Sequence, residues 1–350
     1  MFCSNIAYGV SQELLTTPST IFSRLIADIQ RARDTIDMEF YIFASDRTGH
    51  AFSELLRRKS RQGVRVRLLV DGFGSRRMSR AMRARMAADG VVVQVYGGFS
   101  NCRNHRKMTI IDGHTAHLGG VNIADRYVVG NRLGIWHDVQ LRFTGGGVAS
   151  LASLFDYDYM LCEGLSVEIP IATPHDDISL CWSECNSGEA MSRLLESVVM
   201  DARRSIIFTT PYFIPSQRML NLLSSAVDRG VSVRVILPLR CDVWAIEDAT
   251  RGYLREAIER GIEVMVTRTA FVHAKMAFVD GRRVVLGSAN LDPRSLHVNR
   301  ELMASTTASN VCLAADDFIR RLLMISSPPT PRELRNIIPA GVVRLFEPIL

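Results

Sequence analysis

The sequence predicts an α/β protein made of two tandem α/β/α sandwich domains that are related by pseudo-twofold symmetry and share one site. Three observations lead to this prediction. The chain has 350 residues, more than a single hydrophobic core usually supports. A set of residues recurs along it at a nearly constant interval. In each repeat, stretches of helical periodicity alternate with short strands rich in valine and isoleucine, a pattern typical of α/β architecture.

Two copies of a His-x-Lys-(x)4-Asp motif define the repeat. The first copy is His105, Lys107 and Asp112, and the second copy, 168 residues later, is His273, Lys275 and Asp280. The same interval relates Asn122 to Asn290, and an interval of 167 relates residues 63–67 to residues 230–234. Register kept over so long a span is not expected by chance, so we interpret the chain as a duplicated domain.

Each half is expected to contain the same elements in the same order. They are a helix (22–34 and 191–203), a strand (36–43 and 205–210), a helix (50–62 and 217–228), a strand (64–70 and 231–237), a helix (79–89 and 246–260) and a strand (91–96 and 263–267). Each His-x-Lys pair then opens a fourth strand that continues to the motif aspartate.

The domain boundaries follow from the repeat. We expect a first domain at 1–162, a linker at 163–188, a second domain at 189–325 and a C-terminal tail at 326–350. Within the tail, residues 334–350 are largely apolar with two arginines, which fits either packing against the body or an interfacial membrane helix. The N-terminal residues do not have the pattern of a signal peptide, and no stretch is apolar for long enough to cross a membrane, so we expect a peripheral protein.

Composition narrows the class of partner. The net charge is +6, which favours an anionic partner but does not choose between phospholipid head groups and nucleic acid. Arginines between 76 and 85 form either a solvated face or a patch that attracts head groups. Seven cysteines without a Cys-x-x-Cys pair are interpreted as reduced thiols in a cytosolic protein, and no spacing predicts a zinc site.

The motif residues indicate phosphate chemistry. In a strand, the His and Lys of each copy point to the same face, whereas Asp112 and Asp280, at an odd offset, face away and are expected to stabilise the following turn. Glycine-rich loops follow both motifs. Their backbones and polar side chains are expected to bind phosphate oxygens, with Gly120, Asn122, Ser288 and Asn290 as the candidates.

Two such motifs placed face to face suit phosphodiester chemistry without a metal ion or cofactor. One neutral histidine attacks phosphorus to form a phosphohistidine, and the other protonates the leaving alkoxide. The lysines and asparagines stabilise charge on the other oxygens. Each histidine also needs an acceptor for its second ring nitrogen, and the candidates are Asp138 and Glu301, which lie 33 and 28 residues after the two motif histidines. A single His-x-Lys pair occurs often by chance, so this interpretation depends on the matched register.

From about residue 22 to 321, the chain resembles the phospholipase D superfamily and, more narrowly, bacterial cardiolipin synthases. The similar stretches are 41–43, 62–64, 71–75, 103–107 and 119–123 in the first half, and 211–215, 272–275 and 287–295 in the second. The resemblance implies phosphatidyl transfer in which two phosphatidylglycerols give cardiolipin and glycerol at the cytoplasmic side of the inner membrane. It implies that His105 is the nucleophile and His273 the general acid and base. By the same resemblance, the phosphate is bound by Lys107, Lys275, Asn122 and Asn290, and the histidines are oriented by Asp138 and Glu301, while Asp112 and Asp280 complete the motif.

Alternatives remain beside this reading. Many members of the synthase family begin with two transmembrane helices that are not seen here, which leaves the pair of lipids open. A phospholipase D-type hydrolase or a nuclease would use the same fold, although no aromatic and basic stripe for stacking single-stranded bases is evident, so nucleic acid is not expected. A non-enzymatic lipid-binding scaffold would require a broken motif, and neither copy is broken.

Overall fold

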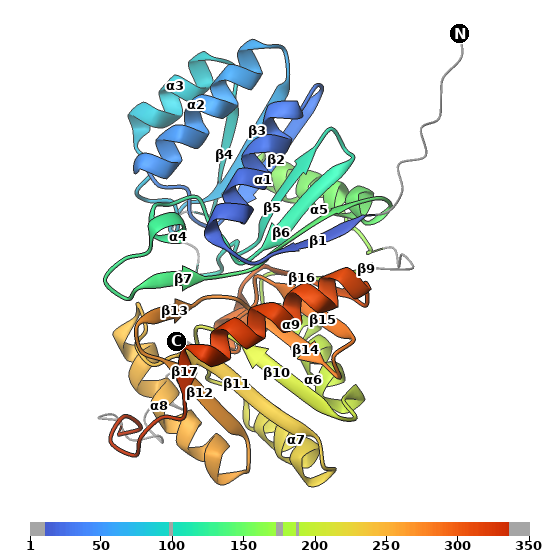
Figure 1. Ribbon diagram of the computed structural model, residues 1–350. Coiled ribbons are helices and arrows are strands. Elements are labelled where there is room, and N and C mark those ends of the chain that lie inside the picture. The colour runs from blue at the N-terminus through green and yellow to red at the C-terminus, as the bar shows by residue number, and fades with distance from the viewer. Residues whose placement is uncertain (1–10, 98–100, 173–177, 187–188, 336–350) are drawn as a thin grey trace.

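The computed structural model of the protein describes residues 11–97, 101–172, 178–186 and 189–335, and it consists of two halves stacked on one another (Figure 1). The first half contains β1 (Gln12–Leu15), α1 (Pro18–Arg31), β2 (Thr35–Phe40), α2 (Arg47–Arg61), β3 (Arg65–Asp71), α3 (Arg80–Ala88), β4 (Val92–Tyr96), β5 (Lys107–Ile111), β6 (Thr115–Gly119), α4 (Arg126–Val129), β7 (Ile135–His137), β8 (Gln140–Thr144) and α5 (Gly147–Cys162). The second half contains β9 (Ile178–Ser183), α6 (Ala190–Asp201), β10 (Ser205–Thr209), α7 (Gln217–Asp228), β11 (Ser232–Pro238), α8 (Trp244–Glu259), β12 (Glu263–Thr267), β13 (Ala270–Val272), β14 (Met276–Val279), β15 (Arg283–Gly287), a π-helical turn (Arg294–Val298), β16 (Glu301–Thr306), α9 (Ser309–Met324) and β17 (Ser326–Ser327).

The two large sheets have the same topology. The first sheet runs β1-β8-β6-β5-β2-β3-β4, and the second runs β9-β16-β15-β14-β10-β11-β12 with the short β17 added at its end. In both sheets the last three strands of this order are parallel, and the pairs before them are antiparallel. This equivalence confirms the predicted duplication and the tandem α/β fold.

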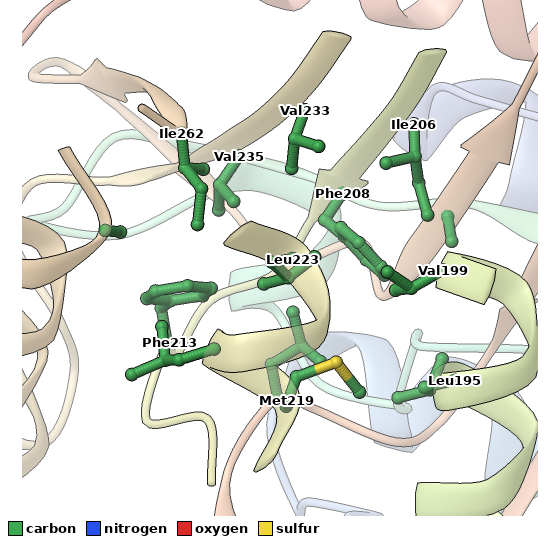
Figure 2. Packing of buried hydrophobic residues seen from close by; sticks show 14 of the residues in the cluster. Leu195, Val199, Ile206, Phe208, Phe213, Met219, Leu223, Val233, Val235 and Ile262 are labelled. Atoms are coloured by element: carbon green, nitrogen blue, oxygen red, sulfur yellow. The ribbon is translucent and has the colours of Figure 1, made fainter. Parts of the chain in front are cut away.

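Helices cover each sheet on both faces. The outer face of the first sheet packs against α1, α2 and α3, and the outer face of the second packs against α6, α7 and α8, where side chains such as Leu195, Phe208 and Leu223 are buried (Figure 2). A central cluster takes side chains from both halves, including Phe155 of α5 and Phe318 of α9. The halves therefore share one core, which fixes their relative position.

The side chains of β14 pack alternately into two hydrophobic clusters, one on each face of the sheet. Met276 and Phe278 belong to the central cluster, whereas Ala277 and Val279 face the outer helices. Side chains alternate between the two faces of a strand, so a run that is apolar at every position is buried on both sides. Complete burial of each large side chain stabilises the fold by roughly 1.5–3 kcal/mol.

The predicted strand at 36–43 ends early, at Phe40. The backbone amide of Ile42 donates to Asn122 Oδ1, and that of Phe43 donates to Ser75 Oγ, at 2.9 Å in both cases. These amides bind loop side chains instead of a neighbouring strand, which directs the chain after β2 toward the loop that follows β6.

The segment predicted as a linker, 163–188, contains β9, whose six residues all pair with β16. Part of this segment therefore belongs to the second sheet, in the position that β1 holds in the first. In the tail, β17 pairs with β12, and Leu334 is buried against the outer core. The expectations for the N-terminal segment 1–10 and for the tail beyond 335 lie outside the described residues. Within the described ranges, no helix is both long and apolar enough to cross a membrane.

The prediction that every cysteine is a reduced thiol is wrong for one pair. Cys102 and Cys185 form a disulfide with a Cα–Cα separation of 5.7 Å. They are 83 residues apart, and only the tertiary fold brings the segment after β4 beside the end of β9, so their spacing carried no signal. Four other cysteines are free thiols, and Cys3 lies outside the described residues.

Candidate active site

Backbone hydrogen bonds between the halves place each motif histidine. The amide of His105 donates to the carbonyl of Arg300 at 2.9 Å, and the amide of Arg300 donates to the carbonyl of Arg103. On the other side, β13 pairs in parallel with β7, and the amide of His273 donates to the carbonyl of His137 at 2.8 Å. Each histidine is thus bound to the segment that immediately precedes a carboxylate of the opposite half.

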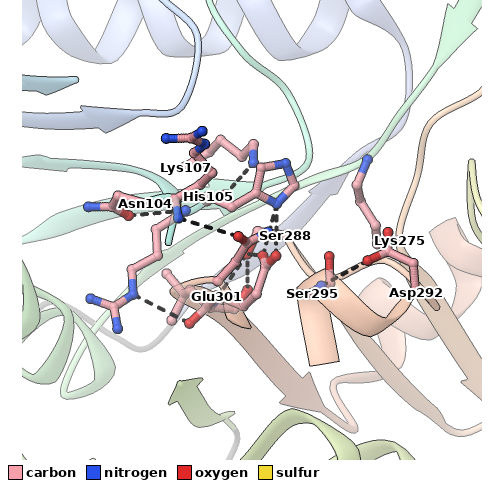
Figure 3. Close-up of polar contacts among 12 residues, drawn as sticks. Asn104, His105, Lys107, Lys275, Ser288, Asp292, Ser295 and Glu301 are labelled. Carbon is pink, nitrogen blue, oxygen red and sulfur yellow. Dashed lines mark hydrogen bonds and ion pairs between the residues drawn. The ribbon is translucent and has the colours of Figure 1, made fainter. Parts of the chain in front are cut away.

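The resulting histidine–carboxylate pairs are crossed. His105 Nδ1 lies 2.9 and 3.0 Å from the two carboxylate oxygens of Glu301, as Figure 3 shows, and His273 Nδ1 lies 2.6 Å from Asp138 Oδ2. Because an ionised carboxylate only accepts hydrogen bonds, Nδ1 carries the proton and Nε2 of each ring keeps its lone pair. The sequence predicted both carboxylates as partners of the histidines, and the structure brings them together.

Burial dominates the protonation of both rings. It lowers the pKa of His105 to about 4, although Glu301 opposes this shift. Burial lowers the pKa of His273 to about 3, with a further lowering from Lys275, against the opposing effect of Asp138. Burial alone would raise the pKa of Glu301, but His105 and Lys107 lower it below its ordinary value. Near neutral pH, the site therefore holds two neutral imidazoles and two ionised carboxylates.

The motif lysines are two of only three lysines in the chain, which otherwise uses arginine for positive charge. Lys107 and Lys275 are 1% and 2% exposed. Lys275 Nζ lies 2.9 Å from each ring nitrogen of His273, and each lysine donates to the carbonyl of its own histidine. Burial lowers the pKa of Lys275 to about 8 and that of Lys107 well below its usual range.

Neither ammonium group has a carboxylate ion-pair partner among the residues that the structure describes. A buried cation without a counter-charge is strongly unfavourable, and an anion bound beside it removes that cost. Two such groups next to two imidazoles are chemically suited to bind an anion. The carboxylates nearby are taken by the histidines, and the described ranges contain no group of three or more His, Cys, Asp or Glu side chains arranged to hold a metal ion.

Comparison with known proteins agrees with this geometry. The family profile "Cardiolipin synthase, PLD-like domain" matches residues 25–134 and 195–323, which is more than half of the chain. The chain belongs to this phospholipase D-like family. It is 32% identical over 365 aligned residues to a cardiolipin synthase of Geobacillus kaustophilus, covering 96% of this chain and 72% of the relative. It is 33% identical to a probable cardiolipin synthase of Bacillus subtilis, covering 85% of this chain and 63% of the relative.

Solved structures share the fold of this phospholipase D-like chain. The phosphatidylserine synthase of Haemophilus influenzae superimposes with a TM-score of 0.74 at 15% identity, covering 96% of this chain and 92% of that one. A polyphosphate kinase from Porphyromonas gingivalis superimposes with a TM-score of 0.66 at 15% identity, covering 96% of this chain and 52% of that one. The two-domain arrangement therefore recurs at low sequence identity.

Two of the residues expected to bind phosphate lie behind the carboxylates instead. Ser288 is buried and donates its hydroxyl to Glu301 (Figure 3). A Cβ added to Gly120 would lie 2.4 Å from Asp138 Oδ1, so glycine there leaves room for the carboxylate. Gly120 and Ser288 are equivalent positions of the phospholipase D-like repeat. Ser288 holds Glu301 by a hydrogen bond, and Gly120 leaves the space that Asp138 occupies.

The asparagines that follow these positions differ from each other. Asn122 Oδ1 accepts from the amide of Ile42 at 2.9 Å, and Asn122 Nδ2 donates to the Tyr127 hydroxyl at 2.7 Å. The buried Asn290 Oδ1 has no hydrogen-bond partner among the described residues. The first asparagine is therefore held by the protein, and the second has an unused acceptor.

The motif aspartates lie at the far ends of β5 and β14. Asp112 accepts hydrogen bonds from the backbone amides of residues 33–35, and Asp280 accepts them from those of residues 203–205, at 2.7–3.2 Å. Both aspartates have φ of +52°, a conformation that asparagine and aspartate tolerate better than most residues. They were grouped with the catalytic residues as part of the motif, but these contacts fix the turns that lead into β2 and β10.

Aromatic rings that sequence reasoning missed surround both imidazoles. The Tyr41 ring centroid lies 4.9 Å from that of His105, and those of Tyr127 and Trp136 lie 5.3 and 5.0 Å from that of His273. These rings desolvate the histidines and lower their pKa. Two signals were available: Trp136 stands two residues before Asp138, and Tyr41 lies in the stretch 41–43 that resembles the family.

A buried ion network behind the site was also missed. Arg106, between the motif His and Lys, donates to Asp158 and Glu184, and Arg300, next to Glu301, donates to Asp158 at 2.5 Å. Arg300 also pairs with Glu184 at 2.5 Å. The network joins the residues beside His105 and Glu301, so it sets the position of one crossed pair. Arg106 has Ala274 as its counterpart in the second motif, and the repeat could not reveal it.

Proposed function

We propose that the protein transfers a phosphatidyl group through a covalent phosphohistidine, with phosphatidylglycerol as donor and acceptor and cardiolipin as product. The observation that carries the proposal is the meeting of two neutral imidazoles, each held at Nδ1 by a carboxylate, with two buried lysine side chains that form no carboxylate ion pair among the described residues. The names of the relatives, cardiolipin synthases, support this lipid class. The chain spans 63–72% of the length of these two relatives, so their activity is extended to it here as part of the proposal.

In the first step, His105 Nε2 attacks the phosphorus of phosphatidylglycerol. The bond from phosphorus to the glycerol oxygen of the head group breaks, and His273 donates a proton to that oxygen. The free His273 is neutral, but a phosphodiester anion bound beside it raises its pKa, so that it gains the proton in the complex. Free glycerol leaves, and the phosphatidyl group remains on His105.

In the second step, the head-group hydroxyl of another phosphatidylglycerol attacks the phosphohistidine. His273, now neutral, accepts the hydroxyl proton, the bond from phosphorus to Nε2 breaks, and cardiolipin forms. Glu301 stabilises the positive charge that the His105 ring carries while phosphorus is attached. Water in place of the lipid hydroxyl would give phosphatidic acid, so exclusion of water decides between transfer and hydrolysis.

We assign charge stabilisation on the non-bridging oxygens to Lys107 and Lys275, and to Nδ2 of Asn122 and Asn290, because an amide nitrogen has two hydrogens to donate. Donors placed where charge develops act strongly in a site from which water is excluded. We place the reaction at the cytoplasmic surface of the inner membrane, where a protein of net charge +6 is attracted to anionic lipid.

The test is product analysis with purified protein and phosphatidylglycerol vesicles in excess EDTA. We expect cardiolipin and glycerol in equal amounts, no product from H105A or H273A, and normal turnover from H50A, a control at an exposed histidine of α2. With a substrate that has an activated leaving group, H273A should accumulate a lipid–protein adduct and H105A should not. Activity that disappears in EDTA and returns with a divalent metal would contradict the mechanism.

A further inference from the structure

Three short segments beside His273 each contain one residue that faces this histidine and at least one exposed apolar residue. In α4, Tyr127 contacts the His273 ring, while Val129 is 68% exposed. In β7, Trp136 contacts the same ring and is 1% exposed, while the preceding Ile135 is 49% exposed. The same segments that place Tyr127 and Trp136 against His273 thus carry other, apolar side chains into solvent.

The third segment is the loop between β11 and α8. Its Asp242 lies close enough to His273 to raise that ring's pKa, against the larger lowering by burial. The next two residues, Val243 and Trp244, are 42% and 63% exposed. An exposed tryptophan and three exposed aliphatic side chains in segments that all adjoin His273 are unusual on a soluble surface, where large apolar side chains scatter singly.

Basic side chains lie in the same region. Residues 131–134, Arg240 and residues 267–270 line a hollow of about 340 Å³. Arg268 in this hollow pairs with Glu333. Arg132 and Arg240 are exposed, and neither has a hydrogen-bond or ion-pair partner among the residues that the structure describes. Two unpaired guanidinium groups at one hollow fit a phosphate head group.

We infer that Val129, Arg132, Ile135, Arg240, Val243 and Trp244, called here the docking patch, bind the surface of an anionic phospholipid bilayer. The inference rests on the proposed function, because it brings the lipid head group to His273 without removing the lipid from its leaflet. Apolar side chains with a tryptophan enter the interface between head groups and acyl chains, and the arginines bind lipid phosphates. Valine and isoleucine do not stack on bases, so the patch favours a bilayer over single-stranded nucleic acid.

The first test is cosedimentation with vesicles of equal parts phosphatidylglycerol and phosphatidylcholine. R132E/R240E should weaken binding by at least about tenfold at low salt, since each basic residue near an anionic surface contributes on the order of 1 kcal/mol. The matched control is R33E/R65E, which makes the same charge change at exposed arginines near the amino ends of β2 and β3. I135S/W244S should also weaken binding, and its control is M200S/L313S, at residues that are 48% and 72% exposed on α6 and α9.

A second measurement separates this inference from the proposed function. With short-chain phosphatidylglycerol dissolved as monomers, both patch variants should turn over substrate at the wild-type rate, while they lose turnover on vesicles. If the wild type binds vesicles through the patch but converts no phosphatidylglycerol, the docking inference stands and the proposed function fails. The inference is overturned if the patch variants bind vesicles as strongly as the control variants do. It is also overturned if the patch variants lose binding to single-stranded DNA but keep binding to vesicles. Unchanged melting temperatures establish that each variant is folded.

Discussion

His105 Nδ1 lies 2.9 Å from Glu301 Oε1, a carboxylate 196 residues later in the chain. The reciprocal pair joins His273 to Asp138 across 135 residues. Each half of the duplicated fold thus supplies one imidazole and the carboxylate that orients the other. Neither motif histidine is paired with a carboxylate of its own half.

The crossed pairs predict a shared phenotype for E301Q and D138N. A carboxamide can donate to Nδ1, which moves the ring proton to Nε2 and removes the lone pair that the reaction needs. We expect kcat to fall by roughly 10²–10⁴-fold in each variant, with little change in KM and an altered pH profile. E256Q, at a surface ion pair of α8, is the control. A normal kcat with only a lower melting temperature would show that the carboxylates act in folding alone.

Binding of an anion should bring a proton into the site. The pKa of His105 is about 4 and that of His273 about 3 in the free protein, so both rings are neutral near pH 6, and a bound negative charge raises both pKa values. Diethyl phosphate, which does not titrate in this range, should bind with uptake of part of a proton. Calorimetry in buffers of different ionisation enthalpy measures this uptake, and the double variant H105A/H273A should lose it. Release of a proton on binding would contradict the assignment.

The lowered pKa of Lys275, about 8, predicts an alkaline limit to activity. Above that pH, the amine loses the charge that attracts the phosphodiester, so kcat/KM of the free enzyme should fall. Because a guanidinium stays charged, K275R should shift the fall to higher pH while lowering the maximum rate. K59R is the control, at the third lysine of the chain. If the alkaline fall in kcat/KM occurs at the same pH in K275R, the titration of another group causes it.

The motif aspartates are predicted to act on stability and not on turnover. D112N and D280N keep a residue that tolerates positive φ but weaken three backbone hydrogen bonds, so we expect a loss of about 1–3 kcal/mol in the free energy of unfolding and unchanged kcat per folded molecule. Burial would raise the pKa of Asp280, but hydrogen bonds from three backbone amides lower it.

A carboxyl with a depressed pKa stabilises the fold above its unfolded value, and that contribution disappears as the pH falls through the folded value. Denaturation curves of D280N should therefore lose part of the acid dependence seen in the wild type below about pH 4. An equal acid dependence in both proteins would argue against this role, as would a kcat that falls in proportion to stability.

The disulfide predicts a covalent link beside the site. Non-reducing peptide mapping, after alkylation of free thiols, should find one peptide pair that contains Cys102 and Cys185. C102S/C185S should unfold more easily by about 2–4 kcal/mol, because the bridge restricts the unfolded chain. C162S/C181S, at two free thiols, is the control. If both cysteines are instead recovered in separate alkylated peptides, the disulfide is absent and the prediction of reduced thiols is correct.

The repeat made much of the fold and the site predictable. The recurrence of His105 at His273 located the duplicated strands, and the search for an acceptor at each ring located Asp138 and Glu301. The sequence did not predict that each histidine pairs with the carboxylate of the opposite half. This pairing depends on β13 lying beside β7 and on Arg300 lying beside His105. Those contacts join segments with no sequence relation.

Other features have similar reasons for being missed. β9 lies in a region that contains Pro170, and its partner β16 follows more than a hundred residues later, so it read as a linker. Arg106 occupies the variable position of the motif, and its carboxylate partners come from α5 and from the end of β9. Gly120 and Ser288 were predicted to bind phosphate because polar and flexible loops often do so. In the structure, Glu301 accepts the Ser288 hydroxyl and Asp138 fills the space beside Gly120.

The crossing also sets an order in which the enzyme becomes competent during synthesis. Asp138 leaves the ribosome long before His273, but His105 is made 196 residues before Glu301. Throughout that interval the first imidazole has neither its acceptor nor the second sheet that desolvates it. In a nascent or truncated chain, the proposed nucleophile His105 therefore lacks its carboxylate, and reactivity toward lipid is expected only when β16, which begins at Glu301, has been translated and has docked.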